Sequence, residues 1–294
     1  MIGKDTLQES TLDNWVDEFY EIYKNKDRKR TISNMWLHLV ENASKVGEAT
    51  RKNEWGEACK ELSHVFCWLC GFVAKCRDKD SSNDIDQVFF LDEPLSEIVW
   101  NKYPNACWKC RSSPCQCSTN RIEIEDIPEK RVEETKRLAF LRAQKHNMPG
   151  PLDDWVDMFR MIYENAHYGY PIDYVCFHFL EEVGEVARAI LALSQFAGKE
   201  KFKEEEAKKL EEERGKFKEE LADVFSWIAS FVSKLGFLSD TMSNYHQAYS
   251  GSKENIEIKF SRIVWTAYKS TRGDFMVCPP PYCENRPCTC PDCF

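Results

Sequence analysis

The chain has 294 residues, of which 43% are hydrophobic, so it has enough apolar side chains for the cores of two ordinary domains. Its formal net charge of −9 argues against a broad nucleic-acid-binding surface. The sequence contains no apolar run near the ~20 residues of a membrane span and no apolar signal-peptide segment at its start. We therefore expect a cytoplasmic protein that contacts neither membrane nor nucleic acid.

Helical periodicity runs through the whole chain and predicts an all-α fold. In the first half, helices are expected over residues 11–23, 33–51, 55–76 and 95–102, with Thr11 or Asp13 as the first cap. The second half repeats this series at 153–163, 173–196, 202–235 and 254–270. An amphipathic helix is expected at 131–144 between the halves, and polar loops at 81–92 and 239–252.

An internal repeat explains why the two series correspond. The segment LDNWVDEFYEIYKN, which begins at Leu12, matches LDDWVDMFRMIYEN, which begins at Leu152, at nine of fourteen positions. The offset between the copies is 140 residues here, and it becomes 159 after a charged insertion of 19 residues in the second copy. We predict a first repeat over residues 1–117, a charged linker over 118–150 and a second repeat over 151–294.

Two acidic clusters lie within apolar helical patterns of the second repeat. The first is Glu181, Glu182 and Glu185, and the second contains Glu220 and Asp223. Spacings of three and four residues place side chains on a common helix face. Carboxylates that face a neighbouring helix are costly unless they are paired or bind a metal, and Mg²⁺ prefers such oxygen ligands. The alternative is an ordinary solvated helix face.

This order of acids, EExxE followed by ExxD, resembles the MazG-like family of all-α nucleoside triphosphate pyrophosphohydrolases. The resemblance implies Mg²⁺-dependent hydrolysis of a nucleoside triphosphate to a monophosphate and pyrophosphate, with these five acids as metal ligands. The gap between the two parts of the pattern is longer here than is usual in the family. Glu182 is the candidate general base, because it is rotated about 100° from the row formed by Glu181 and Glu185. The rival interpretation is a nucleotide-sensing or regulatory protein without turnover.

Three further side chains are candidates for substrate binding. Lys259 and Arg262 are spaced to share one face of the last helix, where they could hold phosphates or form an ordinary cationic surface. His178 precedes the acids by one turn and could contact the base or a metal ligand, or serve as a core histidine.

The first repeat has lost most of the acidic pattern. Its five corresponding residues are Glu41, Asn42, Lys45, Glu61 and His64, so only two acids remain. A lysine at this position would repel a divalent cation. We expect a degenerate copy that pairs with the second repeat as a built-in dimer partner, and the resemblance also implies a homo-oligomer.

Each repeat ends in a cysteine cluster. The first is Cys107, Cys110, Cys115 and Cys117, and the matching four in the second are Cys278, Cys283, Cys288 and Cys290. Four thiolates separated by turn-forming residues are typical of a structural zinc site. An iron–sulfur cluster and redox-active or disulfide-bonded cysteines are the alternatives. The clusters could also dock a protein partner.

Overall fold

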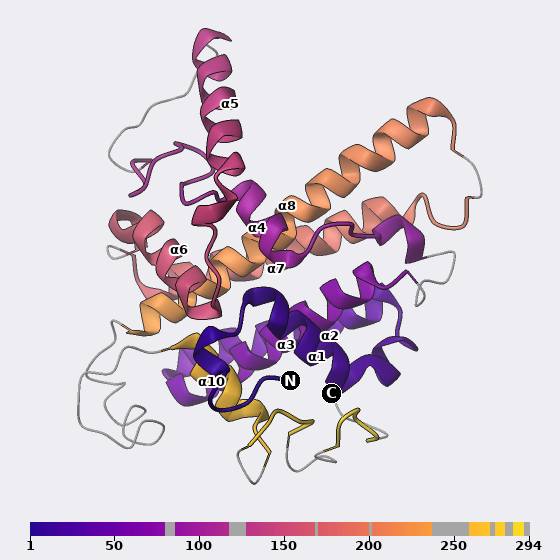
Figure 1. Cartoon of the computed structure of the whole chain (residues 1–294), viewed down its shortest axis with the longest axis vertical. Helices are drawn as coiled ribbons and strands as arrows, with labels where there is room; N and C mark the ends of the chain where they lie inside the picture. Colours follow the sequence, from indigo (N-terminus) through magenta and orange to yellow (C-terminus); the bar gives the residue numbers. More distant parts are fainter. Residues whose placement is uncertain are drawn as a thin grey trace.

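The computed structural model describes residues 1–79, 86–117, 128–167, 170–199, 202–236, 259–270, 274–279 and 285–290. Within these residues the regular structure is helical, as predicted, with isolated β-bridges in place of strands. The first half forms α1 (Leu12–Asp27), α2 (Ile32–Lys52), α3 (Trp55–Arg77) and α4 (Leu95–Lys102). The second half forms α6 (Leu152–His167), α7 (Ile172–Ser194), α8 (Glu204–Gly236) and α10 (Phe260–Tyr268), and α5 (Pro128–Ala143) lies between the halves (Figure 1). Short 3₁₀ turns lie at Leu7–Glu9, Asp86–Phe89 and Lys145–Asn147.

Local sequence fixes where the first helices begin and end. The Thr11 hydroxyl accepts a hydrogen bond from the Asn14 amide at 3.2 Å, and the Asn14 side chain accepts one from the Thr11 amide at 3.0 Å. This reciprocal capping box satisfies donors that the first turn of α1 leaves without partners. Asn53 ends α2 in a left-handed conformation, with φ of 58°, which asparagine tolerates better than most residues.

The last described helix, α10 (Phe260–Tyr268), covers the second part of the helix predicted over residues 254–270. It begins at Phe260, because Lys259 is extended and Asp153 caps the first turn from another helix. The Asp153 carboxylate accepts hydrogen bonds from the Ser261 amide at 3.0 Å and the Ser261 hydroxyl at 2.5 Å. The remainder of the expected 254–270 helix before Lys259, like the expected loop at 239–252, lies outside the described residues. The expected loop at 81–92 contains a 3₁₀ turn at Asp86–Phe89.

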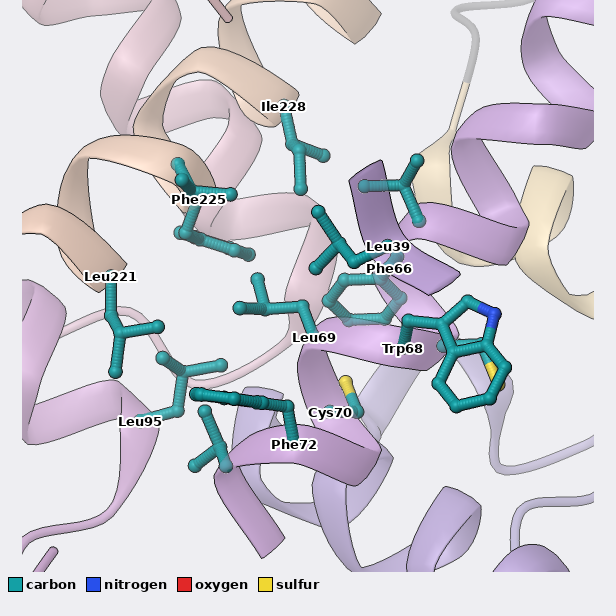
Figure 2. Packing of buried hydrophobic residues seen from close by; sticks show 14 of the residues in the cluster. Leu39, Phe66, Trp68, Leu69, Cys70, Phe72, Leu95, Leu221, Phe225 and Ile228 are labelled. Carbon is teal, nitrogen blue, oxygen red and sulfur yellow. The ribbon is translucent and has the colours of Figure 1, made fainter. Parts of the chain in front are cut away.

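One continuous apolar core spans both halves. Phe66 of α3 lies against Phe225 of α8, with ring centroids 6.4 Å apart, and against Phe260 of α10 at 5.0 Å. Figure 2 shows Leu69 and Phe72 of α3 facing Leu221 of α8 across the same core. Burial of each such side chain contributes roughly 1.5–3 kcal/mol, so the two halves stabilise one another.

The C-terminal part of each half reaches the other half. Helix α4 packs on α8, and α10 packs on α3 (Figure 1). Beyond these helices, the Cys115 amide donates to the Ile162 carbonyl on α6 at 2.6 Å. In the equivalent contact, the Cys288 amide donates to the Ile22 carbonyl on α1 at 2.7 Å. The cysteine cluster that follows one repeat in sequence therefore lies against the first helix of the other repeat.

Candidate functional site

Three carboxylates from two neighbouring helices meet on one side of α7 and α8. Glu182 and Glu185 of α7 and Glu220 of α8 each offer an oxygen atom, and these atoms all lie within 4.8 Å of one another. The surrounding apolar residues explain the orientation: Val183 and Leu221 are buried in the core, so the adjacent acids border it. All three acids are partly buried. This is an oxygen-rich set that suits a hard cation.

A fourth acid, Asp223, lies one turn beyond Glu220 and is held by α4 of the first half. Its side chain is only 11% exposed. The Tyr103 hydroxyl donates to Asp223 Oδ1 at 2.5 Å, and the Lys102 ammonium forms an ion pair with Asp223 Oδ2. The Lys102 ammonium also donates to the Glu219 carbonyl at 3.3 Å. The acid site of the second half is therefore completed by a cation from the first half.

Burial and the neighbouring negative charges raise the pKa values of three of these acids, Glu182, Glu220 and Asp223. Desolvation, followed by the charges of Asp223, Glu185 and Glu220, raises the pKa of Glu182 from 4.5 to about 8. Desolvation and the charge of Asp223 raise the pKa of Glu220 to about 7. Burial also raises the pKa of Asp223, although Lys102 opposes that shift. A bound cation would favour the ionised carboxylates and reverse these shifts.

Glu181 occupies a different position from the other predicted ligands. Its side chain is 60% exposed, and His178 Nδ1 lies 2.9 Å from its carboxylate. His178 in turn stacks on Trp227 of α8, with ring centroids 4.9 Å apart and an interplanar angle of 14°. Glu181 therefore contacts His178 at the exposed edge of the site. It lies outside the group of three oxygen donors formed by Glu182, Glu185 and Glu220.

Of the two predicted phosphate-binding cations, Lys259 immediately precedes α10 and Arg262 lies in its first turn. The main neighbours of α10 are α3, α6 and the 3₁₀ turn at Leu7–Glu9. Arg262 is exposed. Burial raises the pKa of Asp154 of α6, and the nearby charge of Lys259 partly opposes that rise. At the other end of α10, the Tyr268 hydroxyl contacts His64 Nδ1 of α3 at 2.8 Å. These contacts place α10 beside the first-half copy of the site.

Lys102 and Tyr103 were not among the site residues predicted from the sequence. A signal for Tyr103 was present, because the IVW motif that aligns Ile98 with Ile263 also aligns Tyr103 with Tyr268. The same alignment places Ala267 opposite Lys102. Both tyrosines hold the residue at the Asp223 position of the other half, but only the first-half helix carries a lysine beside it.

The first-half copy of the site keeps its framework but only two of the five acids, Glu41 and Glu61. His38 stacks on Trp68 with ring centroids 4.6 Å apart, as His178 does on Trp227. Glu41 is exposed and forms an ion pair with Lys45 at 2.9 Å. Lys45 occupies the position that Glu185 has on α7. Among the described residues, the potential metal-binding groups comprise the α7–α8 acids and the two cysteine clusters, with none at this first-half copy.

Both cysteine clusters could hold a metal. In the first, the four sulfurs lie within 4.8 Å of one another, with 3.8 Å between Cys107 and Cys117 and 3.9 Å between Cys110 and Cys115. In the second, Cys278, Cys288 and Cys290 are gathered in the same way, with 3.8 Å between Cys278 and Cys290. These separations are far longer than the ~2.05 Å of a disulfide bond. The predicted fourth ligand, Cys283, lies outside the described residues.

Comparison with protein-family models, with characterised proteins and with solved structures finds no match to this chain. In the part of the chain that the structure describes, no helix combines the length and apolar character needed to cross a bilayer. A functional conclusion therefore depends on the geometry of the site itself.

Proposed function

We propose that the protein is a magnesium-dependent hydrolase that converts a nucleoside triphosphate, either NTP or dNTP, to a monophosphate and pyrophosphate. The observation that carries this proposal is the meeting of Glu182, Glu185 and Glu220 within 4.8 Å, with Asp223 one turn away. The resemblance of the EExxE and ExxD patterns to the MazG-like family suggests the reaction.

Glu182, Glu185, Glu220 and Asp223 would hold Mg²⁺. Glu181, which is exposed at the edge of the site, would act through its contact with His178. Bound Mg²⁺ would neutralise charge on the phosphates and lower the pKa of a coordinated water. Glu182 is the candidate general base, because its carboxylate lies within the cluster of oxygen donors. Trp227, stacked on His178, offers an aromatic face beside the acids on which a nucleobase could lie.

The first half would serve as a built-in partner rather than as a second enzyme. The exchange of α4 and α10 between the halves, and the loss of acids beside Lys45, support a fused pseudo-dimer with one competent site. Oligomerisation of whole chains stays a prediction of the resemblance.

The cysteine clusters would each hold a structural zinc ion. Four sulfurs at the usual ~2.3 Å from a tetrahedral zinc are about 3.8 Å from one another. The measured separations in the first cluster are 3.8 and 3.9 Å, and that between Cys278 and Cys290 is 3.8 Å. Four thiolates leave no open coordination position, so this metal would stabilise the fold.

The second candidate function is nucleotide or metal sensing without turnover. The ion pair between Lys102 and Asp223 favours it, because a resident ammonium already supplies positive charge that a catalytic metal would supply. In this case the site would bind its ligand, change the position of α4, and release the ligand intact.

Incubation of the purified chain with each NTP and dNTP and Mg²⁺ separates the two functions. The proposal predicts release of pyrophosphate from at least one nucleotide, and loss of that release with a chelator. Asp223→Asn should lower turnover by orders of magnitude, whereas Glu41→Gln, which removes the exposed first-half acid, should leave it within a few-fold. Nucleotide binding without pyrophosphate release would support sensing instead.

A further inference from the structure

Lys102 is the one residue of the first half whose charged group enters the acid site, among the contacts described. Its ammonium reaches Asp223 Oδ2 and the Glu219 carbonyl, and it lies 5.6 Å from the centroid of the Trp108 ring. The Lys102 side chain is only 13% exposed. A lysine is rarely so buried unless its charge is paired, so this position is a built contact between the halves.

We propose that Lys102 is a substrate-binding residue that the first half supplies to the acid site of the second half. In the metal-free site it neutralises Asp223, and when a divalent cation binds the carboxylates it transfers to the triphosphate. This inference rests on the proposed function, because it assumes that the acids receive a metal–triphosphate complex.

The charges around Lys102 explain the transfer. Glu182, Glu185, Glu220 and Asp223 are concentrated in one partly buried place, where Lys102 pairs with Asp223 and Arg188 of α7 pairs with Glu185. A divalent cation drawn to the same acids would repel the ammonium, and interactions between charges a few ångströms apart are strong in such surroundings. The triphosphate chain would then be the nearest uncompensated anion.

The geometry of Lys102 allows this change of partner. An ammonium has three donors, and in the described structure Asp223 and the Glu219 carbonyl accept from two of them. Contact with the electron-rich face of Trp108 supports the cation without fixing its direction. Tyr103 donates to the other oxygen of Asp223, so that carboxylate keeps its position when the lysine leaves.

The two halves provide an internal comparison. Tyr103 and Tyr268 occupy equivalent positions and each reaches the opposite half, at Asp223 and His64 respectively. The residue before Tyr268 is Ala267, so α10 brings no cation to the first-half copy. The lysine is therefore present at the copy with the full acidic pattern and absent from the copy that keeps only Glu41 and Glu61. A role limited to packing α4 on α8 would not require this correlation.

Lys102→Met tests the inference, because methionine keeps most of the apolar stem and removes the charge. The control is Lys145→Met, which removes an exposed lysine that pairs with Glu97 of α4 at 2.9 Å, away from Asp223. Binding of Mn²⁺ is measured by electron paramagnetic resonance without nucleotide, and binding of inorganic triphosphate with Mg²⁺ by calorimetry. Circular dichroism establishes that each variant is folded, and Lys102→Arg restores the charge.

We expect Lys102→Met to bind Mn²⁺ at least as tightly as the unmodified chain, because Asp223 is released. We expect its affinity for triphosphate to fall on the order of 10- to 100-fold, the range for loss of a hydrogen bond to a charged group. Lys102→Arg should recover part of that affinity, and Lys145→Met should match the unmodified chain in both assays.

Weaker Mn²⁺ binding by Lys102→Met would overturn the inference and indicate a structural role. Unchanged triphosphate affinity of Lys102→Met would overturn it as well. So would misfolding of both Lys102→Met and Lys102→Arg. Neither assay requires turnover. Absence of pyrophosphate release from every nucleotide, together with the expected binding changes, would reject the proposed hydrolysis and leave the role of Lys102 intact.

Discussion

Replacement of Glu182 by glutamine should stabilise the metal-free protein at high pH. The Glu182 carboxyl faces Glu185 on its own helix, Glu220 and Asp223 on α8, and the Lys102 ammonium from α4. Burial and the three like charges raise its pKa from 4.5 to about 8. Between these two pH values the folded protein keeps a proton on Glu182 that the unfolded chain releases. The contribution of Glu182 to the free energy of unfolding is therefore most favourable below pH 4.5 and is lost as the pH rises to about 8.

The expected magnitude is modest because Glu182 is only partly buried. After a discount for solvent screening, ionisation of this carboxyl costs about 1–2 kcal/mol at pH 8. For a chain of this size the substitution should then raise Tm by roughly 2–3 °C. Glutamine resembles the protonated acid, so the difference between Glu182→Gln and the unmodified chain should vanish near pH 5.

Thermal unfolding in a chelating buffer at pH 5 and pH 8 measures this effect. Glu41→Gln is the matched control, because Glu41 is exposed on the first-half helix α2 and pairs with Lys45. Addition of Mg²⁺ at pH 8 should stabilise the unmodified chain more than Glu182→Gln. A pH-independent difference, or a lower Tm for Glu182→Gln at pH 8, would refute the argument from clustered charge.

Four other outcomes are expected from the site and the cysteine clusters. Tyr103→Phe should lower turnover about tenfold, because Asp223 loses a buried hydrogen bond; steady-state kinetics would measure this, and an unchanged kcat would contradict it. Elemental analysis should find about two zinc ions per chain, and visible absorbance from iron would contradict the assignment. The double change Cys115→Ser with Cys117→Ser should remove one zinc and raise KM, because that cluster adjoins Lys102 through Trp108. Cys288→Ser with Cys290→Ser should remove the other zinc and lower Tm with little effect on kinetics, and equal kinetic effects of the two pairs would contradict this difference.

The helices could be predicted because each half presents a continuous helical pattern with recognisable capping residues. Thr11, one of the two caps expected from the sequence, begins α1 through a local capping box with Asn14. The start of α10 could not be predicted in this way, because its cap is Asp153, which lies 108 residues away in the sequence. The packing of α4 and α10 on opposite halves could not be predicted either, since a repeat alignment does not say whether α4 packs on its own half or on the other.

The acid site was predictable in composition but not in orientation. Glu182 lies three residues after the buried Phe179 and four before the buried Val186, so it borders the core-facing stripe of α7. Glu181 lies two residues after Phe179, on the opposite side, and the structure exposes it. The spacing of the buried apolar residues thus contained information that the spacing of the acids alone did not. Lys102 is 121 residues from Asp223 and could be found only from the fold.

The exchange of C-terminal segments has a consequence for how the repeat could evolve after a gene duplication. If each copy borrows a helix from the other to complete its site, then mutations that destroy the acids of the first copy do not make that copy dispensable. Its α4 segment would still supply Lys102 and Tyr103 to the remaining acid site, whereas α10 would no longer have to supply residues to a functional site. Ala267 on α10, and Lys45 and His64 in the first copy, are the substitutions that such unequal selection would leave behind. Separately expressed halves should therefore complement one another only when the first half brings its tail.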